Sequence, residues 1–423
     1  DGIVTLEVGL DLFPMVAATL ASVTCGVLGN FLVLRRLSLM GDAISHSVLP
    51  GLVIAFLIAS TRSPAVMFLG AAIAGVATVV LVELVKRLGR VEPGAAMGVV
   101  FSVLFALGVI LIEEAARHVD LDADCVLHGD LETLVWYGAP RGWSEVWSVE
   151  TLRSAPRQVV TLAIACVASF ALVVVLFKEL RLAAFDPELS TTQGFSSTLL
   201  HSILMVFVAV ATVASFEAVG SILVIAMLVC PAATARLLTD RLGPQVACSV
   251  VVALVCGLGG YLAATMVPAL WGAPSVKASG AMAVMGGVCV AAAALASPRH
   301  GVVARMVAQA RVSRATEVDD LMAMLFRAEE GGVVITASGA RAERIASRRG
   351  LVRVERDGGM ALTQRGRTAA AEVVRRHRLW EAYLVDEAGV APDHVHATAE
   401  RLEHLPVAPG RVSDRDPHGR AIP

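Results

Sequence analysis

Long apolar runs alternate with short charged segments through the first 300 residues. The runs have the length at which a helix crosses a bilayer, about 20 residues. The second run is short, and only a tight turn over residues 217–220 separates the sixth from the seventh, which leaves eight or nine crossings open. The pattern predicts an all-α polytopic membrane domain with runs at roughly 13–34, 44–60, 64–85, 94–112, 158–177, 199–216, 219–237, 245–268 and 276–297.

Basic residues follow every odd-numbered run. They are Arg35 and Arg36, then Lys86, Arg87 and Arg90, then Lys178 and Arg181, then Arg236 and Arg241, and finally Arg299. Because loops rich in lysine and arginine stay in the cytoplasm, the N-terminus is expected outside and the C-terminus inside. We expect a multi-pass protein, and the localisation that we predict for it is a bacterial-type inner (plasma) membrane.

The composition changes after Pro298. The whole chain is 56% hydrophobic and 17% charged with a mean hydropathy of +0.71, yet residues 299–423 contain no further apolar run and many charged residues. We therefore expect a membrane domain over 1–300 and a cytoplasmic domain over 301–423. The net charge of −2 gives no overall attraction to nucleic acid.

The stretch LSLMGDAISHSVLPG (37–51) places ionisable residues beside the second run. Asp42 and His46 are four residues apart, so they share one face of a helix. A carboxylate with an imidazole suits manganese, zinc or iron. Two ligands do not complete a coordination shell, so the remaining ligands would come from a second subunit, another helix, water or backbone carbonyls. The alternative is that Asp42 caps the helix and His46 is a packed side chain.

The loop after the fifth run contains residues that typically begin and end a short helix. Asp186 can cap it, Pro187 and Glu188 suit its first turn, and Gly194 can end it. Such a helix on the cytoplasmic face can dock into a partner, although a plain turn is the alternative. The sequence has no GxxxxGK[ST] phosphate-binding pattern, so energy would come from another chain or from an ion gradient.

Histidine and glutamate recur at helical spacing near the C-terminal end. His377 and Glu381 are four residues apart, and His396, Glu400 and His404 follow the same interval, with Glu403 adjacent. Two such helices can converge on a metal ion. A solvated polar face is the alternative.

Three motifs resemble the ABC-3 family, the permease subunits of ABC importers for manganese, zinc and iron. They are RRLSLMGDAISHSVLPG, FKELRLAAFDPELSTTQG (177–194) and AVGSILVIAMLVCPAATARLLTDRLG (218–243). The resemblance implies a non-enzymatic transporter subunit that works with ABC ATPase subunits, a second permease subunit and an extracellular metal-binding protein. It also implies that Asp42 and His46 form the intramembrane metal site and that Asp186, Pro187, Glu188 and Gly194 belong to the ATPase-coupling helix.

The C-terminal region resembles the iron- and manganese-dependent repressors of the diphtheria toxin repressor type. The stretch 350–367 is similar to their winged hairpin, and the match ends at DPHGRAIP (416–423). By position, one metal site would hold His377, Glu381 and His396, and the other Glu400, Glu403 and His404. Glutamate at position 400 favours the manganese-responsive members. The expected fold is a small α/β domain, a winged-helix remnant with a helical metal-binding and dimerisation part.

Two departures from the repressor pattern affect its function. Val318 follows the Thr316-Glu317 pair, so a ligand of the second site is expected to be missing. The stretch 331–350 is too short for both helices of a helix-turn-helix, although Arg341, Arg344, Arg348 and Arg349 remain for phosphate contacts. Metal sensing is therefore favoured over operator binding, with a structural dimerisation remnant as the alternative. The rival functions for the whole chain are a membrane-tethered transcription regulator and an ATP-independent metal transporter.

Overall fold

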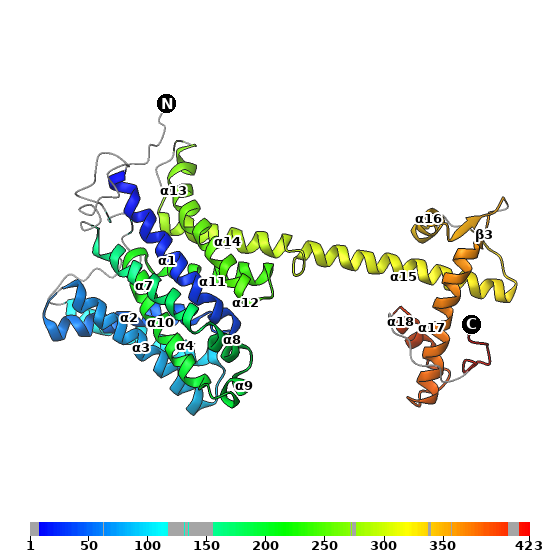
Figure 1. The fold of residues 1–423 in the computed structure, drawn as a ribbon, viewed down its shortest axis with the longest axis horizontal. Coiled ribbons are helices and arrows are strands. Elements are labelled where there is room, and N and C mark those ends of the chain that lie inside the picture. Colours follow the sequence, from blue (N-terminus) through cyan, green and yellow to red (C-terminus); the bar gives the residue numbers. More distant parts are fainter. Residues whose placement is uncertain are drawn as a thin grey trace. The chain divides into compact units, whose positions relative to one another are not determined.

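The computed structural model describes most of the chain. The residues described are 8–61, 63–116, 131, 134, 155–270, 272, 276–336, 340–356, 358–404 and 414–423. Contacts divide the chain into two compact units, Asp1–Val303 and Ala304–Pro423. Each unit is described by itself, and Figure 1 traces their elements along the sequence.

The first unit is entirely helical in its described part. Eight of its helices are long and apolar enough to cross a membrane, and a ninth apolar helix, Leu223–Leu238, is shorter. This confirms the expected polytopic membrane fold. The long elements are α1 (Val8–Leu34), α2 (Met40–Ala59), α3 (Pro64–Gly89), α4 (Pro93–Ala116), α7 (Arg157–Val175), α10 (Ser197–Val219), α11 (Ser221–Leu238), the run α12–η3–α13 (Leu242–Leu254, Val255–Gly259, Gly260–Ala269) and α14 (Ala278–Ala296).

Gly220 makes the tight turn between the sixth and seventh apolar runs. Its φ of 81° lies in the left-handed region that glycine adopts without strain, and its N–H bonds to the carbonyl of Phe216 to close α10. The fifth run ends earlier than expected, because the short helix α8 (Phe177–Phe185) begins directly after Leu176. The apolar pattern therefore predicted as one run the end of α7 and the start of α8, which are separate helices.

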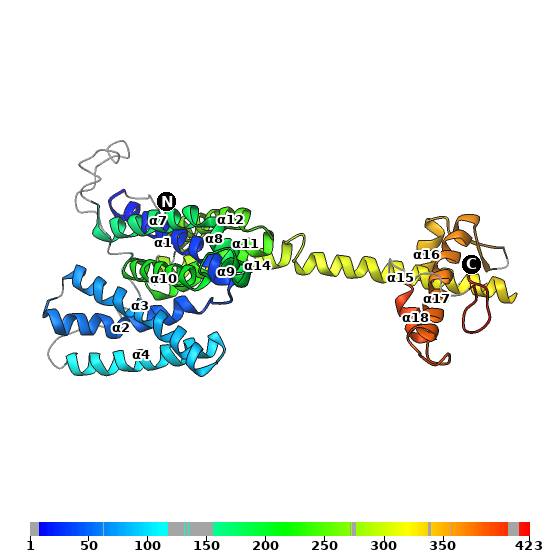
Figure 2. The same ribbon diagram turned by 60° about the horizontal axis from the view of Figure 1, so that its bottom comes forward.

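Helix α1 is the central helix of the membrane unit. It packs against α7, α10, α11 and α12, and 78% of its apolar window is buried, against 22% for α4 and α14. Glycines allow the closest approaches: a Cβ at Gly29 would meet the carbonyl of Leu228, and Gly51 of α2 faces Gly70 of α3. Figure 2 shows α2, α3 and α4 side by side. Small residues at such crossings are how membrane helices pack without a hydrophobic driving force.

Polar contacts join the basic ends of several helices at one face. Arg35, after α1, donates to His201 Nδ1 of α10 at 2.7 Å and to the carbonyl of Ala183 at 3.0 Å. His201 Nε2 lies 3.9 Å from Glu83 of α3. The ends of α1, α3 and α8 thus meet where the basic loops lie, as the positive-inside pattern predicts. At the other end of α1, Tyr261 donates to Asp11 at 2.8 Å.

The second unit is a small α/β domain. Its elements are α15 (Val302–Gly331), β1 (Ile335–Thr336), α16 (Arg341–Arg348), β2 (Val352–Val354), β3 (Gly359–Leu362), α17 (Gln364–Asp386) and α18 (His396–Leu402). The antiparallel sheet has the order β1-β3-β2, with Val354 and Ile335 both opposite Met360. Apolar residues of α15, α16 and the sheet form the core, including Leu321, Met322 and Leu325.

One helix, α16, lies between β1 and β2 in the described part of this domain. A complete helix-turn-helix before the winged hairpin needs two helices. The shortened DNA-reading element stays a prediction, which the single helix in this described segment supports.

Candidate metal sites

Helix α2 carries the first candidate pair in its first two turns. His46 Nε2 lies 3.3 Å from Asp42 Oδ1, as the spacing of four residues predicts for a helix. Their side chains remain 26% and 38% exposed within the single chain, so both atoms are open on one side. Asp42 accepts no capping hydrogen bond at the start of α2, where Leu39 is the N-cap residue. The capping alternative therefore has no support in this geometry.

The second nitrogen of His46 is unusual for a packed side chain. Nδ1 is buried and has no hydrogen-bond partner, while the ring lies against Phe101 and Phe105 of α4 with centroids 5.2 and 5.7 Å away. A buried polar nitrogen without a partner costs free energy, so its presence needs an explanation. The pair of a carboxylate and an incompletely satisfied imidazole fits a divalent transition metal.

The serines that flank His46 bond within the protein. Ser45 donates to the carbonyl of Gly41 at 2.8 Å, and Ser47 donates to that of Ile44 at 3.0 Å and lies 2.5 Å from the Thr78 hydroxyl. Among the described residues, the two clusters of three or more ligand-type side chains both lie in the C-terminal unit. Asp42 and His46 thus leave most of a coordination shell to groups from outside this chain or to water.

Helix α9 (Pro187–Thr192) follows α8 as the sequence predicts. The Asp186 side chain accepts from the N–H of Leu189 at 2.9 Å, Pro187 occupies the first turn, and Gly194 takes a φ of 89° just beyond the end. Buried Ser190 donates to the carbonyl of Phe195 at 3.3 Å and holds the returning chain. Glu188 is exposed in the first turn.

Exposed apolar side chains lie on and beside α9. Phe185 is 56% exposed, Leu189 43% and Phe195 42%. These three residues surround α9 at the end of the unit where Arg35 bonds to Ala183 of α8. Exposed apolar side chains around a well-capped helix are typical of a docking element.

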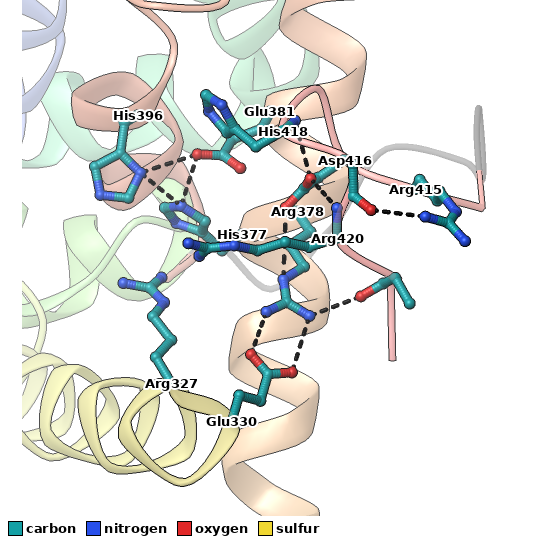
Figure 3. A network of polar contacts seen from close by, with 12 residues as sticks. Arg327, Glu330, His377, Arg378, Glu381, His396, Arg415, Asp416, His418 and Arg420 are labelled. Carbon is teal, nitrogen blue, oxygen red and sulfur yellow. Dashed lines mark hydrogen bonds and ion pairs between the residues drawn. The ribbon is translucent and has the colours of Figure 1, made fainter. Parts of the chain in front are cut away.

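The second candidate site joins α17 and α18 (Figure 3). His377 Nε2 lies 3.0 Å from Glu381 Oε1 and 3.1 Å from His396 Nδ1, and those two atoms are 2.9 Å apart. Ligands at right angles around a metal with bonds of about 2.1 Å are separated by roughly 3 Å. The three donor atoms that the sequence grouped are therefore spaced as neighbouring ligands of one ion.

Glu403 supports this triad from behind. Its carboxylate accepts from Nδ1 of His377, which leaves Nε2 to face Glu381 and His396. A carboxylate behind a ligating histidine fixes the ring and raises its basicity. The sequence assigned Glu403 to the other site, whereas this oxygen lies at the first one.

Burial and charge act together on these groups. Burial lowers the pKa of His377, but hydrogen bonds to Glu381 and Glu403 raise it by more, so the net shift is upward. Burial raises the pKa of Glu381, but hydrogen bonds from His377 and His396 lower it by more, so the pKa falls to about 2. Without metal, these contacts favour the protonated form of the His377 imidazole between the two carboxylates. A cation can replace that proton's charge at the same place.

A second cluster in this domain includes a residue that the sequence analysis missed. Asp320 of α15, Glu403 and His404 bring ligand atoms together, with His404 Nε2 3.2 Å from Asp320 Oδ1. The carboxylate expected to be missing after Glu317 is supplied three residues along the helix. Glu400, which the sequence placed in this site, is exposed and lies outside the cluster, although its charge raises the pKa of Asp320 together with burial.

Buried Arg378 anchors the C-terminal end beside these clusters, also in Figure 3. It donates to Glu330 Oε2 of α15 at 2.6 Å and to the carbonyl of Ala421 at 2.7 Å. Asp416 Oδ1 accepts from the N–H groups of His418 and Arg420 at 3.0 and 2.8 Å. The segment DPHGRAIP therefore lies against α17, and Arg378 joins it to α15 through Glu330.

Known proteins share both units. The family model of the ABC 3 transport family matches residues 12–136 and 150–308, and the iron dependent repressor metal binding and dimerisation domain matches 363–406. A manganese transport system membrane protein of Bacillus subtilis (MntD) is 40% identical over 68% of this chain and 92% of its own length. A zinc transport system membrane protein of Treponema pallidum (TroD) is 38% identical over 71% of this chain and 77% of its own length.

A solved structure shares the membrane fold. The structure of PsaBC from Streptococcus pneumoniae in complex with Fab superposes with a TM-score of 0.54 at 24% identity, over 68% of this chain and 92% of that one. The family model matches well over half of the sequence, and the motifs around Asp42, Asp186 and Gly220 fall within it. This chain is a multi-pass membrane protein that belongs to the ABC 3 transport family.

Proposed function

We propose that this chain is the permease subunit of an ATP-driven importer of a divalent transition metal, with manganese as the main substrate. The observation that carries the proposal is the Asp42–His46 pair, with its 3.3 Å contact and an imidazole Nδ1 that is buried and unpartnered. Relatives that transport manganese and zinc support the substrate class. The carboxylate and imidazole ligands suit both ions, so uptake must distinguish them.

The pair needs further ligands, and a second permease subunit is the source we favour. Both side chains are partly open in the single chain, and a symmetric partner would double the ligand count without any new residue type. A metal delivered by an extracellular binding protein would be held there while its hydration shell is replaced. Ser45 and Ser47 already bond within the protein and supply no ligand in this arrangement.

We infer that α9 is the element through which ABC ATPase subunits drive the change of access. Asp186 and Gly194 define its two ends, and Leu189 presents an apolar side chain from the middle. ATP hydrolysis then belongs to the separate ATPase chains. Uptake in proteoliposomes that lack any ATPase would contradict this and favour a secondary transporter.

For the C-terminal domain we propose sensing of cytoplasmic metal. The triad of His377, Glu381 and His396 would hold the ion, with Glu403 orienting His377. A membrane-tethered transcription regulator is less well supported, because only α16 lies between β1 and β2 in the described residues. A structural dimerisation remnant would keep the fold but would not respond to metal.

The test is uptake into proteoliposomes that contain the permease with its ATPase. We expect ATP-dependent accumulation of radioactive manganese, with zinc as a weaker competitor, and reduced uptake when manganese is also enclosed. His396→Ala should remove that inhibition and keep basal uptake. The control is His394→Ala, an exposed histidine two residues away that bonds only to Asp393. Equal inhibition in both variants would leave the domain without a sensing role.

A further inference from the structure

The winged part of the C-terminal domain concentrates positive charge. Residues 340–367 contain eight arginines and three acidic residues, a net charge of +5. Residues 368–423, which include both metal-ligand helices, contain seven arginines and nine acidic residues. The domain is therefore polarised between a basic winged segment and an acidic metal-binding segment.

Helix α16 presents the basic residues on one side. Arg341, Arg344 and Arg348 recur at intervals of three and four residues and are exposed, while Ile345 and Ala346 of the same helix contact the domain core. Arg349 follows directly. Within the part of the chain that the structure describes, these four arginines form no ion pair.

The same region exposes aliphatic side chains. Val333 is 64% and Val334 73% exposed just before β1, and Val354 of β2 is 56% exposed. The sheet pairing brings β1 and β2 to either side of β3, and α16 packs against β2. Clustered arginines and exposed apolar side chains within one small fold suit a surface that binds at a lipid–water interface.

We propose that this basic winged surface, defined by Arg341, Arg344, Arg348, Arg349, Arg353 and Arg356 with Val333, Val334 and Val354, binds the anionic phospholipid headgroups of the cytoplasmic leaflet. The guanidinium groups bind the phosphodiesters, and the valines enter the interface. The chain runs from the end of α14 at Ala296 through α15 to β1 at Ile335, so one covalent segment tethers this surface to the membrane unit and sets its effective concentration at the leaflet.

The local fold favours lipid over sequence-specific binding to nucleic acid here. Sequence-specific binding to DNA needs a recognition helix presented to a groove, and the described region has one helix of eight residues before the hairpin. Headgroup binding needs only clustered charge without a fixed register. The acidic α17–α18 segment is repelled by the same headgroups, so docking would leave the metal clusters facing the cytoplasm.

The experiment is hydrogen exchange of the full chain in nanodiscs. We compare discs of phosphatidylcholine alone with discs that contain a third of phosphatidylglycerol. Each arginine at an anionic surface is expected to raise partitioning about fivefold. Exchange of α16 and of the β2–β3 hairpin should therefore slow at least about tenfold in the anionic discs. Salt at about 1 M, where the Debye length is about 3 Å, should abolish the difference.

Two double variants test whether the protection depends on the arginines of α16 or only on the total charge of the domain. Arg344→Glu with Arg348→Glu should lose the lipid-dependent protection, whereas Arg375→Glu with Arg401→Glu makes the same charge change on α17 and α18 and should retain it. Exchange of the α17 amides reports whether each variant is folded. Equal exchange of α16 in both kinds of disc, or protection that survives the first variant, would overturn the proposal. Protection by added duplex DNA in neutral discs, without protection by phosphatidylglycerol, would assign the surface to nucleic acid instead.

Discussion

The Nδ1 atom of His377 on α17 donates to the carboxylate of Glu403, which follows α18. This contact determines which imidazole nitrogen faces Glu381 and His396, because a neutral histidine can present only one free lone pair. It also fastens the end of α18 to α17. The His377–Glu403 pair thus both holds α18 against α17 and orients a ligand of the metal site.

Glu403→Gln is predicted to weaken manganese binding by the C-terminal domain about 10- to 100-fold. The amide keeps the size of the side chain but removes the negative charge behind His377. The measurement is equilibrium dialysis of the full chain in the Asp42→Ala background, so that the membrane pair does not contribute. Glu387→Gln, an exposed glutamate directly after α17, is the matched control. Equal affinities of the two variants would show that Glu403 does not orient the site.

The metal-free domain is predicted to lose stability as the pH rises through neutrality. The pKa of His377 is raised in the folded domain despite burial and nearby Arg327, so its favourable contacts are complete below its unfolded value of about 6.5 and disappear as the pH passes the folded value. Glu381 has the opposite sign: its contribution is present above about 4.3 and is lost as the pH falls toward its folded value of about 2.

Calorimetry checks this dependence. The unfolding temperature of the metal-free domain within the full chain should fall between about pH 6 and pH 9. Saturating manganese should reverse the trend, because deprotonated His377 is the ligand. His394→Ala should keep the wild-type slope, since that exposed ring lies outside the triad. A flat profile without metal would contradict the assigned protonation of His377.

Asp186→Ala is predicted to uncouple ATP hydrolysis from transport more than it affects folding. The change removes the hydrogen bond to the Leu189 N–H, and loss of such a cap costs about 1 kcal/mol. The measurement is permease-stimulated ATPase activity beside uptake in the same proteoliposomes. Thr192→Ala, which removes a bond to the carbonyl of Leu189 at the other end of α9, is the control. Normal stimulation and uptake in Asp186→Ala would contradict a coupling role for the capped end of α9.

Gly51→Leu is predicted to prevent the packing of α2 on α3. A Cβ at Gly51 would lie 2.5 Å from the carbonyl oxygen of Gly70, and a Cβ at Gly70 would lie 2.6 Å from that of Gly51. Because these are backbone atoms, whole helices must separate. Folded yield in detergent by size exclusion should fall sharply. Gly98→Leu on α4, where no atom lies within 4 Å, should fold normally.

The sequence predicts most of the membrane fold because bilayer thickness fixes the length of each run and basic loops fix its direction. Two boundaries differ from the prediction: α2 begins at Met40 rather than at 44, so Asp42 lies inside the helix, and α8 is distinct from α7. Periodicity carries no signal for the π-turn η3 at Val255–Gly259, which interrupts an otherwise continuous apolar helix. These features depend on packing between helices rather than on local composition.

The candidate sites could be predicted from the sequence only where their residues are close along the chain. Asp42 with His46 and His377 with Glu381 are local pairs at one helical turn, so their proximity follows from sequence. Asp320 was not found, because it joins His404 only through the packing of α15 beside the end of α18. Glu400 shares the helical interval but faces solvent. Helical spacing defines a stripe, and only the tertiary fold selects which members of the stripe meet.

The most direct test of the account is ATP-dependent manganese uptake by proteoliposomes that contain Asp42→Ala permease, measured beside Ser45→Ala on the same helix. Ser45 bonds only to the carbonyl of Gly41, one turn away, so its loss should leave uptake near the wild-type rate. Asp42→Ala should abolish uptake while the folded protein remains in the membrane. Uptake at the wild-type rate in folded Asp42→Ala would contradict the assignment of the Asp42–His46 pair as the transport site.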